Sequence, residues 1–93
     1  MLESKLQAKI IKTLKKIDGC YCVKYPGGPY GTKGTPDILG SLDGRMFAIE
    51  VKVGDNTASD AQEEQLRRWG LSNALQGVAW SVEDALRIVG VLE

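Results

Sequence analysis

Histidine is absent from this sequence of 93 residues, and cysteine occurs at only two positions, Cys20 and Cys22. The missing histidine excludes Ser-His-Asp and Cys-His catalysis and also histidine-based nucleases and phosphohydrolases. A single C-x-C pair supplies too few ligands for a zinc site. Alternation places both sulfurs on one side of a strand, so we expect buried free thiols. Any catalysis must therefore rest on carboxylates, lysines, hydroxyl groups or a metal ion.

Long apolar runs and a net charge are missing as well. No stretch approaches the roughly 18 apolar residues of a membrane span, and the start of the chain leads into helical periodicity rather than an apolar signal core. We therefore expect one soluble domain over residues 1–93 in the cytoplasm, or in the host cytoplasm if a phage encodes it, with no membrane partner.

The balanced charge is unevenly distributed along the chain. Residues 1–36 carry seven lysines against Glu3 and Asp18, about +5, whereas residues 37–93 come to about −5. A polyanion can therefore bind only on the side of the molecule that carries these lysines. Lysines that merely solvate a helix surface give the same pattern, so charge alone does not decide between the two interpretations.

Periodicity and turn signals predict an α/β fold in the order helix, three strands, helix, strand, helix. Apolar residues at helical spacing from Leu2 to Ile17 predict a first helix that ends near Asp18-Gly19. The remaining signals predict strands over 20–25, 37–42 and 45–53, a helix over 60–75 capped by Ser59, a strand over 77–81 and a helix over 82–89 capped by Ser81. We expect a mixed central sheet flanked by helices.

The pair Asp43-Gly44 is the strongest short hairpin signal in the chain. If these two residues form a type I′ turn, Leu42 pairs with Arg45 and, counting back, Asp37 faces Glu50. Directly opposed side chains have Cβ atoms roughly 4.5–5.5 Å apart on one face of the sheet. Lys52 lies two residues beyond Glu50 and shares that face.

Two carboxylates this close repel each other, so a positive group should lie between them. The hard cations Mg²⁺ and Mn²⁺ take oxygen ligands of the kind that Asp37, Glu50 and the Val51 carbonyl can supply. Lys52 can then orient an attacking water or neutralise charge on a phosphate. The alternative is an ordinary hairpin with a weak surface ion pair. Against it, Glu50 lies within a nearly continuous apolar run, typical of a central strand covered on both faces.

Five segments in order resemble the VRR-NUC (virus-type replication-repair nuclease) domain, in the stand-alone form found in phages. They are Glu3 near the start of the first helix, Gly34-x-Pro36-Asp37, Ile49-Glu50-Val51-Lys52, Ser59-x-x-Gln62, and the closing segment Val-Ala-Trp-Ser-Val-Glu-Asp-Ala. The two central segments match the P-D…(D/E)-x-K signature of restriction-endonuclease-like nucleases.

The resemblance implies a restriction-endonuclease-like αβββαβ core and divalent-metal-dependent cleavage of DNA, with Mg²⁺ or Mn²⁺ as cofactor. By position, Asp37 and Glu50 would be metal ligands with the Val51 carbonyl, and Lys52 the catalytic lysine. Stand-alone members are similar to Holliday junction resolvases in size and in acting as homodimers on branched DNA. The resemblance thus implies a structure-specific endonuclease of DNA repair.

Two further catalytic residues implied by the resemblance have structural alternatives. Glu3 would match the helix glutamate that approaches the metal in related resolvases, but the helix dipole favours an acid there regardless. Gln62 would match a glutamine that follows the E-x-K strand, but Ser59-x-x-Gln62 is also a capping box. Gln7, one turn after Glu3, can reach toward the same site, although we expect it to be solvated.

A glycine-rich loop from Pro26 to Gly34 joins the first two predicted strands. It does not lead into a helix, so it is not a nucleotide-binding P-loop. Because it lies beside Asp37, we expect DNA-backbone contacts from this region, with a plain connector as the alternative. The residues that would make them are Lys24, Tyr25, Tyr30 and Lys33.

Two other functions remain open from the sequence. A non-catalytic nucleic-acid-binding module with a nuclease fold would be indicated by a broken acidic pair, yet Asp37, Glu50 and Lys52 are all present. A Mg²⁺-dependent phosphohydrolase of small nucleotides would need a deep enclosed pocket, which a chain of this length can hardly build alone.

Overall fold

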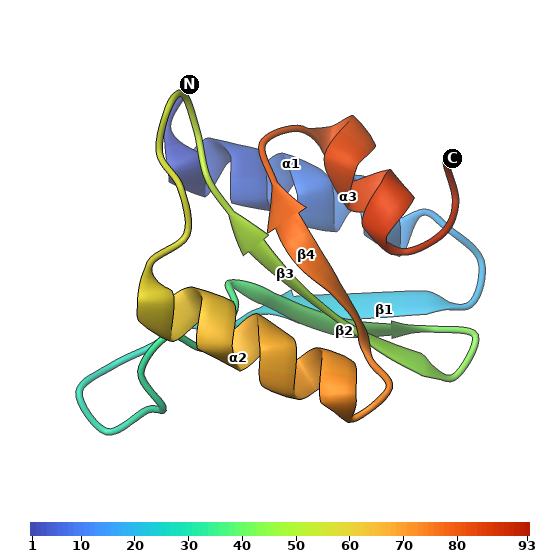
Figure 1. Ribbon diagram of the computed structural model, residues 1–93. Coiled ribbons are helices and arrows are strands. Elements are labelled where there is room, and N and C mark those ends of the chain that lie inside the picture. Colours follow the sequence, from blue (N-terminus) through green and yellow to red (C-terminus); the bar gives the residue numbers. More distant parts are fainter.

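The computed structural model describes all 93 residues, and a four-stranded sheet lies at its centre (Figure 1). The elements are α1 (Glu3–Lys15), β1 (Cys20–Lys24), β2 (Ile38–Leu42), β3 (Arg45–Val51), α2 (Asp60–Leu71), β4 (Leu75–Ala79) and α3 (Val82–Ile88). The strands lie in the order β1-β2-β3-β4, antiparallel except that β4 runs parallel to β3. This confirms the predicted order of elements and the mixed sheet.

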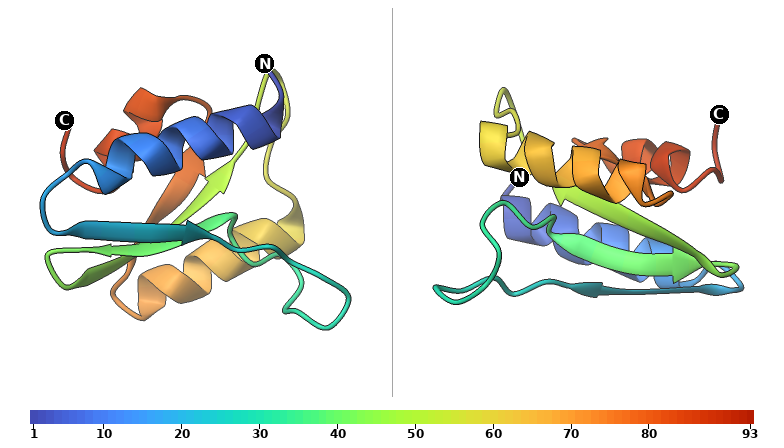
Figure 2. Two further views of the ribbon diagram at one scale, coloured as in Figure 1. Left: turned by 180° about the vertical axis from the view of Figure 1, so that it is seen from behind. Right: turned by 60° about the horizontal axis from the view of Figure 1, so that its bottom comes forward.

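Helices cover both faces of the sheet. Helices α1 and α3 contact each other on one face, and α2 packs against β3 and β4 on the other (Figure 2). The main core lies between the sheet and the α1/α3 layer; it comprises Leu6, Ile10, Leu14, Cys22, Ile38, Phe47, Ile49, Val51, Ala79, Ala85 and Val89. None of the three helices combines the length and the hydropathy that a membrane crossing requires.

The β2–β3 hairpin has the predicted register. Leu42 pairs with Arg45, and Ile38 pairs with Ile49. The turn residues Asp43 and Gly44 have φ angles of 52° and 84°, and two positive angles are what a type I′ turn requires. Strand β3 is buried from Phe47 to Val51, as predicted for a central strand.

The two cysteines are free, and the strand that carries them explains their burial. Cys22 is fully buried and Cys20 partly so, while Tyr21 and Val23 between and after them are exposed. Burial raises the pKa of the Cys22 thiol to about 11. The prediction of buried free thiols is confirmed, with Cys20 less covered than Cys22.

Several predicted boundaries differ from the observed ones. The second helix ends at Leu71 rather than residue 75 because Asn73 adopts a left-handed φ of 71°. Leu75 therefore begins β4, which ends at Ala79. Helix α1 ends at Lys15 in a tight turn in which Lys16 N–H donates to the Thr13 carbonyl, so Gly19 lies beyond the cap. Elsewhere the strand ends shift by one or two residues: β1 ends at Lys24, β2 starts at Ile38 and β3 ends at Val51.

Candidate active site

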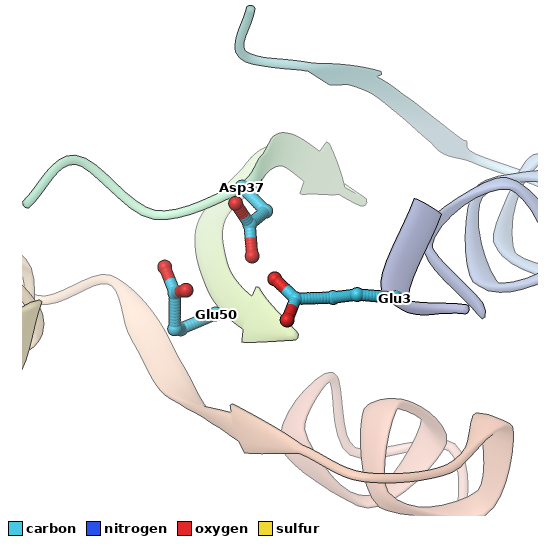
Figure 3. Close-up of side chains that lie close together, drawn as sticks. All are labelled: Glu3, Asp37 and Glu50. Carbon is cyan, nitrogen blue, oxygen red and sulfur yellow. The ribbon is translucent and has the colours of Figure 1, made fainter. Parts of the chain in front are cut away.

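Three carboxylates from three different elements meet at one end of the sheet. Glu3 is the first residue of α1, Asp37 directly precedes β2, and Glu50 lies near the end of β3. One carboxylate oxygen from each residue lies within 4.8 Å of the others, and the side chains converge in Figure 3. The structure thus brings together the predicted pair and also Glu3; these three residues are called the acidic cluster below.

Asp37 is held in place by backbone hydrogen bonds. It lies one residue before the first pair of the β2–β3 ladder, and its carbonyl oxygen accepts a hydrogen bond from Tyr25 N–H at 2.8 Å. Its Oδ2 atom accepts one from Val51 N–H, also at 2.8 Å. The second hydrogen bond ties the carboxylate of Asp37 to the residue that follows Glu50. The predicted juxtaposition of Asp37 and Glu50 is therefore present, although Asp37 lies outside the strand proper.

Glu50 is a buried acid that lacks a full set of partners. Its side chain is 1% exposed; Oε2 lies 3.6 Å from Lys52 Nζ, while Oε1 has no hydrogen-bond partner. Burial, followed by the nearby Asp37 carboxylate, raises the pKa of Glu50 to about 8, and Lys52 only partly opposes this. An unpaired buried carboxylate oxygen is costly unless a cation or donor meets it.

The acidic cluster fits a hard divalent cation. Its donors are all oxygens, and Mg²⁺ and Mn²⁺ prefer carboxylate, carbonyl and water ligands. The unpartnered Oε1 of Glu50 is an acceptor that such an ion would satisfy. The backbone of Val51 adjoins both acids, because its N–H is bonded to Asp37 and it follows Glu50 in the chain.

Lys52 lies directly after β3 and is fixed at its backbone. Its N–H donates to the Ala79 carbonyl at 3.0 Å, which extends the β3–β4 pairing by one step. The side chain is only 14% exposed, with the ammonium beside Glu50. The three carboxylates of the acidic cluster therefore have the ammonium group of Lys52 as their neighbouring positive charge.

Gln62 forms the capping box that was the alternative to a catalytic role. The Ser59 N–H donates to Gln62 Oε1 at 2.8 Å, and the Gln62 N–H donates to Ser59 Oγ at 3.2 Å. Gln62 is not part of the acidic cluster. It does line, together with Asp37, a hollow of about 430 Å³ beside that cluster.

The glycine-rich loop forms most of that hollow. Lys33 and Tyr25 line it, whereas Lys24 and Tyr30 do not; Tyr30 is fully exposed. At the base of the loop, Gly34 has a φ of 82°, and a Cβ there would lie 2.5 Å from the Ala61 carbonyl oxygen. At the tip, nothing lies within 4 Å of a Cβ built on Gly27 or Gly28. The base is therefore packed against the first turn of α2, while the tip is open.

Gln7 is not solvated, and that expectation is wrong. The residue is 6% exposed, and its Oε1 atom is buried without a partner. It lies one turn after Glu3, on the buried side of α1 with Leu6, Ile10 and Leu14. Its four-residue spacing from Glu3 indicated that the two side chains share one face of the helix. Only the packing of α1 on the sheet shows that Gln7 is buried.

A larger hollow of about 790 Å³ lies on the other side of the α1 N-terminus, and the sequence did not predict it. It is bordered by Met1, Leu6, Lys9, residues 53–56 and residues 80–83. Trp80 is 44% exposed there, and its indole N–H donates to the Asn56 carbonyl at 2.8 Å. No member of the acidic cluster lines this hollow.

Comparison by sequence finds no relative: no protein-family model and no curated protein matches the chain. Comparison by structure finds solved proteins with a similar fold. The fold is similar to that of a solved "VRR_NUC domain protein", with a TM-score of 0.75 at 18% identity over 96% of this chain and 85% of the other. A structure described as "VRR_NUC domain" gives a TM-score of 0.71 at 21% identity over 94% and 92%.

The fold is also similar to that of Archaeoglobus fulgidus Hjc, a Holliday junction resolvase from an archaeal hyperthermophile. Here the TM-score is 0.66 at 23% identity, over 84% of this chain and 67% of the other. At these identities the likeness concerns the fold. The chain therefore has the restriction-endonuclease-like fold of VRR_NUC domains, as its sequence motifs predicted.

Proposed function

We propose that this protein is a divalent-metal-dependent endonuclease that hydrolyses phosphodiester bonds in DNA, acting as one catalytic domain over residues 1–93. The observation that carries this proposal is the acidic cluster of Glu3, Asp37 and Glu50, with the Glu50 Oε1 atom buried and unpartnered. The fold shared with VRR_NUC domains and a junction resolvase supports it.

Asp37 and Glu50 are the proposed metal ligands, with the Val51 carbonyl and Glu3 completing the protein's share of the shell. A bound Mg²⁺ or Mn²⁺ supplies a Lewis acid for the scissile phosphate and favours deprotonation of water. The hydrogen bond from Val51 N–H fixes the orientation of the Asp37 carboxylate. These four residues would thus hold the ion beside the scissile phosphate.

Lys52 and Gln62 are the proposed catalytic residues that act on the phosphate and the water. The Lys52 ammonium, held beside Glu50, stabilises the negative charge that develops on the phosphate and orients the attacking water. The capping box uses only the side-chain oxygen of Gln62, so its amide nitrogen is left to donate a hydrogen bond. Capping and catalysis are therefore compatible at Gln62.

Branched DNA, such as a four-way junction, is the proposed substrate, and a homodimer the proposed assembly. A pair of sites suits a junction because two strands must be cut to resolve it, and the neighbour Hjc is a junction resolvase. Lys24, Tyr30 and Lys33 are the proposed DNA-backbone contacts. All three are exposed on the strand and loop that lead to Asp37, and lysine contacts to phosphate position DNA without reading its sequence.

The test is cleavage of labelled four-way junction, flap and linear duplex DNA with Mg²⁺ or Mn²⁺ and with chelator. We expect metal-dependent cutting that prefers the branched substrates and that is lost in Asp37→Ala. The matched control is Asp18→Ala, because Asp18 is an exposed acid outside the cluster. Cutting that persists in Asp37→Ala would refute the assignment of the site. Binding of all substrates without cutting would indicate a nucleic-acid-binding module instead.

A further inference from the structure

Gln7 is a buried polar side chain whose amide oxygen has no hydrogen-bond partner within the protein. It is 6% exposed, and its Oε1 atom has no hydrogen-bond partner. Leaving a buried acceptor unpaired costs on the order of 1–3 kcal/mol, and such atoms are rare in folded proteins. A leucine or methionine would fill the position without that cost, since the other buried residues of α1, Leu6, Ile10 and Leu14, are apolar.

Gln7 lies on α1 one turn after Glu3, a member of the acidic cluster. Gln7 follows Glu3 by four residues, and residues so spaced have Cβ atoms about 5–6 Å apart on one helix face. Side chains on a helix lean toward its N-terminus. The Gln7 amide therefore leans toward the turn that carries Glu3, whose carboxylate lies within 4.8 Å of those of Asp37 and Glu50.

The acidic cluster contains a second unsatisfied acceptor of the same kind. Glu50 Oε1 is also buried without a partner, and the nearest cation, Lys52, lies 3.6 Å from the other oxygen of that carboxylate. Both orphan atoms are oxygens, so neither can satisfy the other once Glu50 is ionised. A hydrated cation supplies what both lack, because the ion meets the carboxylate and its water ligands carry hydrogen atoms to donate.

We propose that Gln7 is a positioning residue of the metal site, whose Oε1 atom accepts a hydrogen bond from a water ligand of the cation held by Glu3, Asp37 and Glu50. This inference rests on the proposed function for the presence of the ion. An amide oxygen is suited to this role because it accepts a hydrogen bond without adding a fourth negative charge. Partners of this outer kind typically change metal affinity by about 10- to 100-fold when removed.

The test measures metal binding without DNA, so that it does not depend on cleavage. Mn²⁺ affinity is determined by calorimetry for the wild type, for Gln7→Met and for Gln76→Met, which makes the same substitution at an exposed site on β4. We expect affinity about tenfold weaker in Gln7→Met and unchanged in Gln76→Met. In chelator, the melting temperature of Gln7→Met should equal or exceed that of the wild type, because an unpaired buried oxygen is removed.

A merely structural role for Gln7 predicts the opposite pattern, namely a lower melting temperature in chelator with unchanged Mn²⁺ affinity, and this result would overturn the inference. So would a wild type that binds no Mn²⁺. If the wild type binds Mn²⁺ but cuts no DNA, the endonuclease proposal fails while weaker binding by Gln7→Met still supports the role of Gln7. If the wild type cuts DNA and Gln7→Met binds Mn²⁺ as tightly, only the inference fails.

A second measurement does not require a variant to fold. In the wild type labelled with ¹⁵N, diamagnetic Mg²⁺ should shift the side-chain amide signals of Gln7 and leave those of exposed Gln76 in place, and substoichiometric Mn²⁺ should broaden the Gln7 signals more strongly than those of Gln76. Signals of Gln7 that neither ion affects would contradict the proposed position of the amide beside the ion.

Discussion

Two glutamates in different regions of the molecule have opposite pKa shifts. Glu64, on the outer surface of α2, contacts Arg67 at 2.6 Å and Arg68 at 3.1 Å, and hydrogen bonds from these guanidinium groups lower its pKa to about 2. Glu50, near the end of β3, is buried beside two other acids, and its pKa is raised to about 8. The same side chain is thus stabilised as an anion in one region and destabilised as an anion in the other.

The difference lies in where the partners come from. The partners of Glu64 follow it at i+3 and i+4 on one helix, so the local sequence alone provides them. The neighbours of Glu50 arrive from α1 and from the segment before β2, and two of them are acids. Glu64 is therefore paired with two guanidinium groups of its own helix, whereas Glu50 has one lysine beside it and two further acids nearby.

Replacing each glutamate by glutamine tests this contrast most directly. Glu50→Gln removes a proposed metal ligand, so we expect junction cleavage to fall by about 10³-fold. Glu64→Gln makes the same change on the surface of α2 and should leave the cleavage rate within about twofold of the wild type. Single-turnover cleavage rates at saturating Mn²⁺ provide the measurement. Comparable losses in both variants would remove the distinction between the two regions.

The pH dependence of stability separates the two glutamates in the metal-free protein. An acid whose pKa rises on folding, from 4.5 to about 8 for Glu50, makes the folded chain bind the extra proton between these values. The free energy of unfolding should therefore fall as pH rises from about 4.5 to about 8, by on the order of 5 kcal/mol. Urea denaturation in chelator at a series of pH values measures this fall.

Two variants check the origin of that pH dependence. It should largely disappear in Glu50→Gln, because glutamine cannot ionise. It should persist in Glu64→Gln, because the Glu64 carboxyl of the wild type titrates below this pH window. Saturating Mn²⁺ should also flatten the profile, since the cation favours the ionised form of Glu50. A wild-type profile that is already flat in chelator would contradict the burial argument for Glu50.

Removing the positive charge of Lys52, which lies beside the acidic cluster, should slow cleavage less than removing a metal ligand does. Lys52→Met retains the length of the side chain but loses the charge, so we expect cleavage to fall by about 10²-fold. It should also raise the pKa of Glu50 further, because Lys52 is the group that lowers it. The control is Lys12→Met, at an exposed position of α1. Equal rates for Lys52→Met and the wild type would exclude a role for the lysine in catalysis.

The smallest expected effects on cleavage come from the start of α2, where Gln62 is both part of the capping box and a proposed catalytic residue. Ser59→Ala and Gln62→Ala each break the capping box and should each lower the free energy of unfolding by about 1 kcal/mol. Only Gln62→Ala removes the amide donor, so we expect it alone to slow cleavage, by about tenfold. Equal cleavage rates in the two variants would leave Gln62 with the capping role only.

The sequence predicted the hairpin well because its signals are local. Asp43-Gly44 specifies the turn, and the turn sets the register that brings Asp37 to Glu50. The boundary between α2 and β4 was misplaced because the apolar pattern continues past Leu71, while the left-handed Asn73 that ends the helix is a weaker signal than a glycine.

Burial of polar residues was predicted only in part. A run of apolar neighbours indicated that Glu50 lies in a covered strand, and it is 1% exposed. Gln7 was expected in solvent, yet it is 6% exposed, because its burial depends on how the helix lies across the sheet. Sequence spacing gives the face of a helix to within a residue or two, but it does not state which of the polar residues at the edge of that face are covered.

The glycine-rich loop has open space around its tip and close packing at its base. Nothing lies within 4 Å of a Cβ built on Gly27 or Gly28, although their φ angles of 70° and 143° favour glycine, whereas any side chain at Gly34 would collide with the first turn of α2. If the loop contacts DNA as proposed, libraries that lengthen the tip and keep both glycines should alter which DNA shapes are accepted while leaving the acidic cluster intact. Under the proposed function, the tip is therefore the place at which substrate range can be varied without replacing a residue of the acidic cluster.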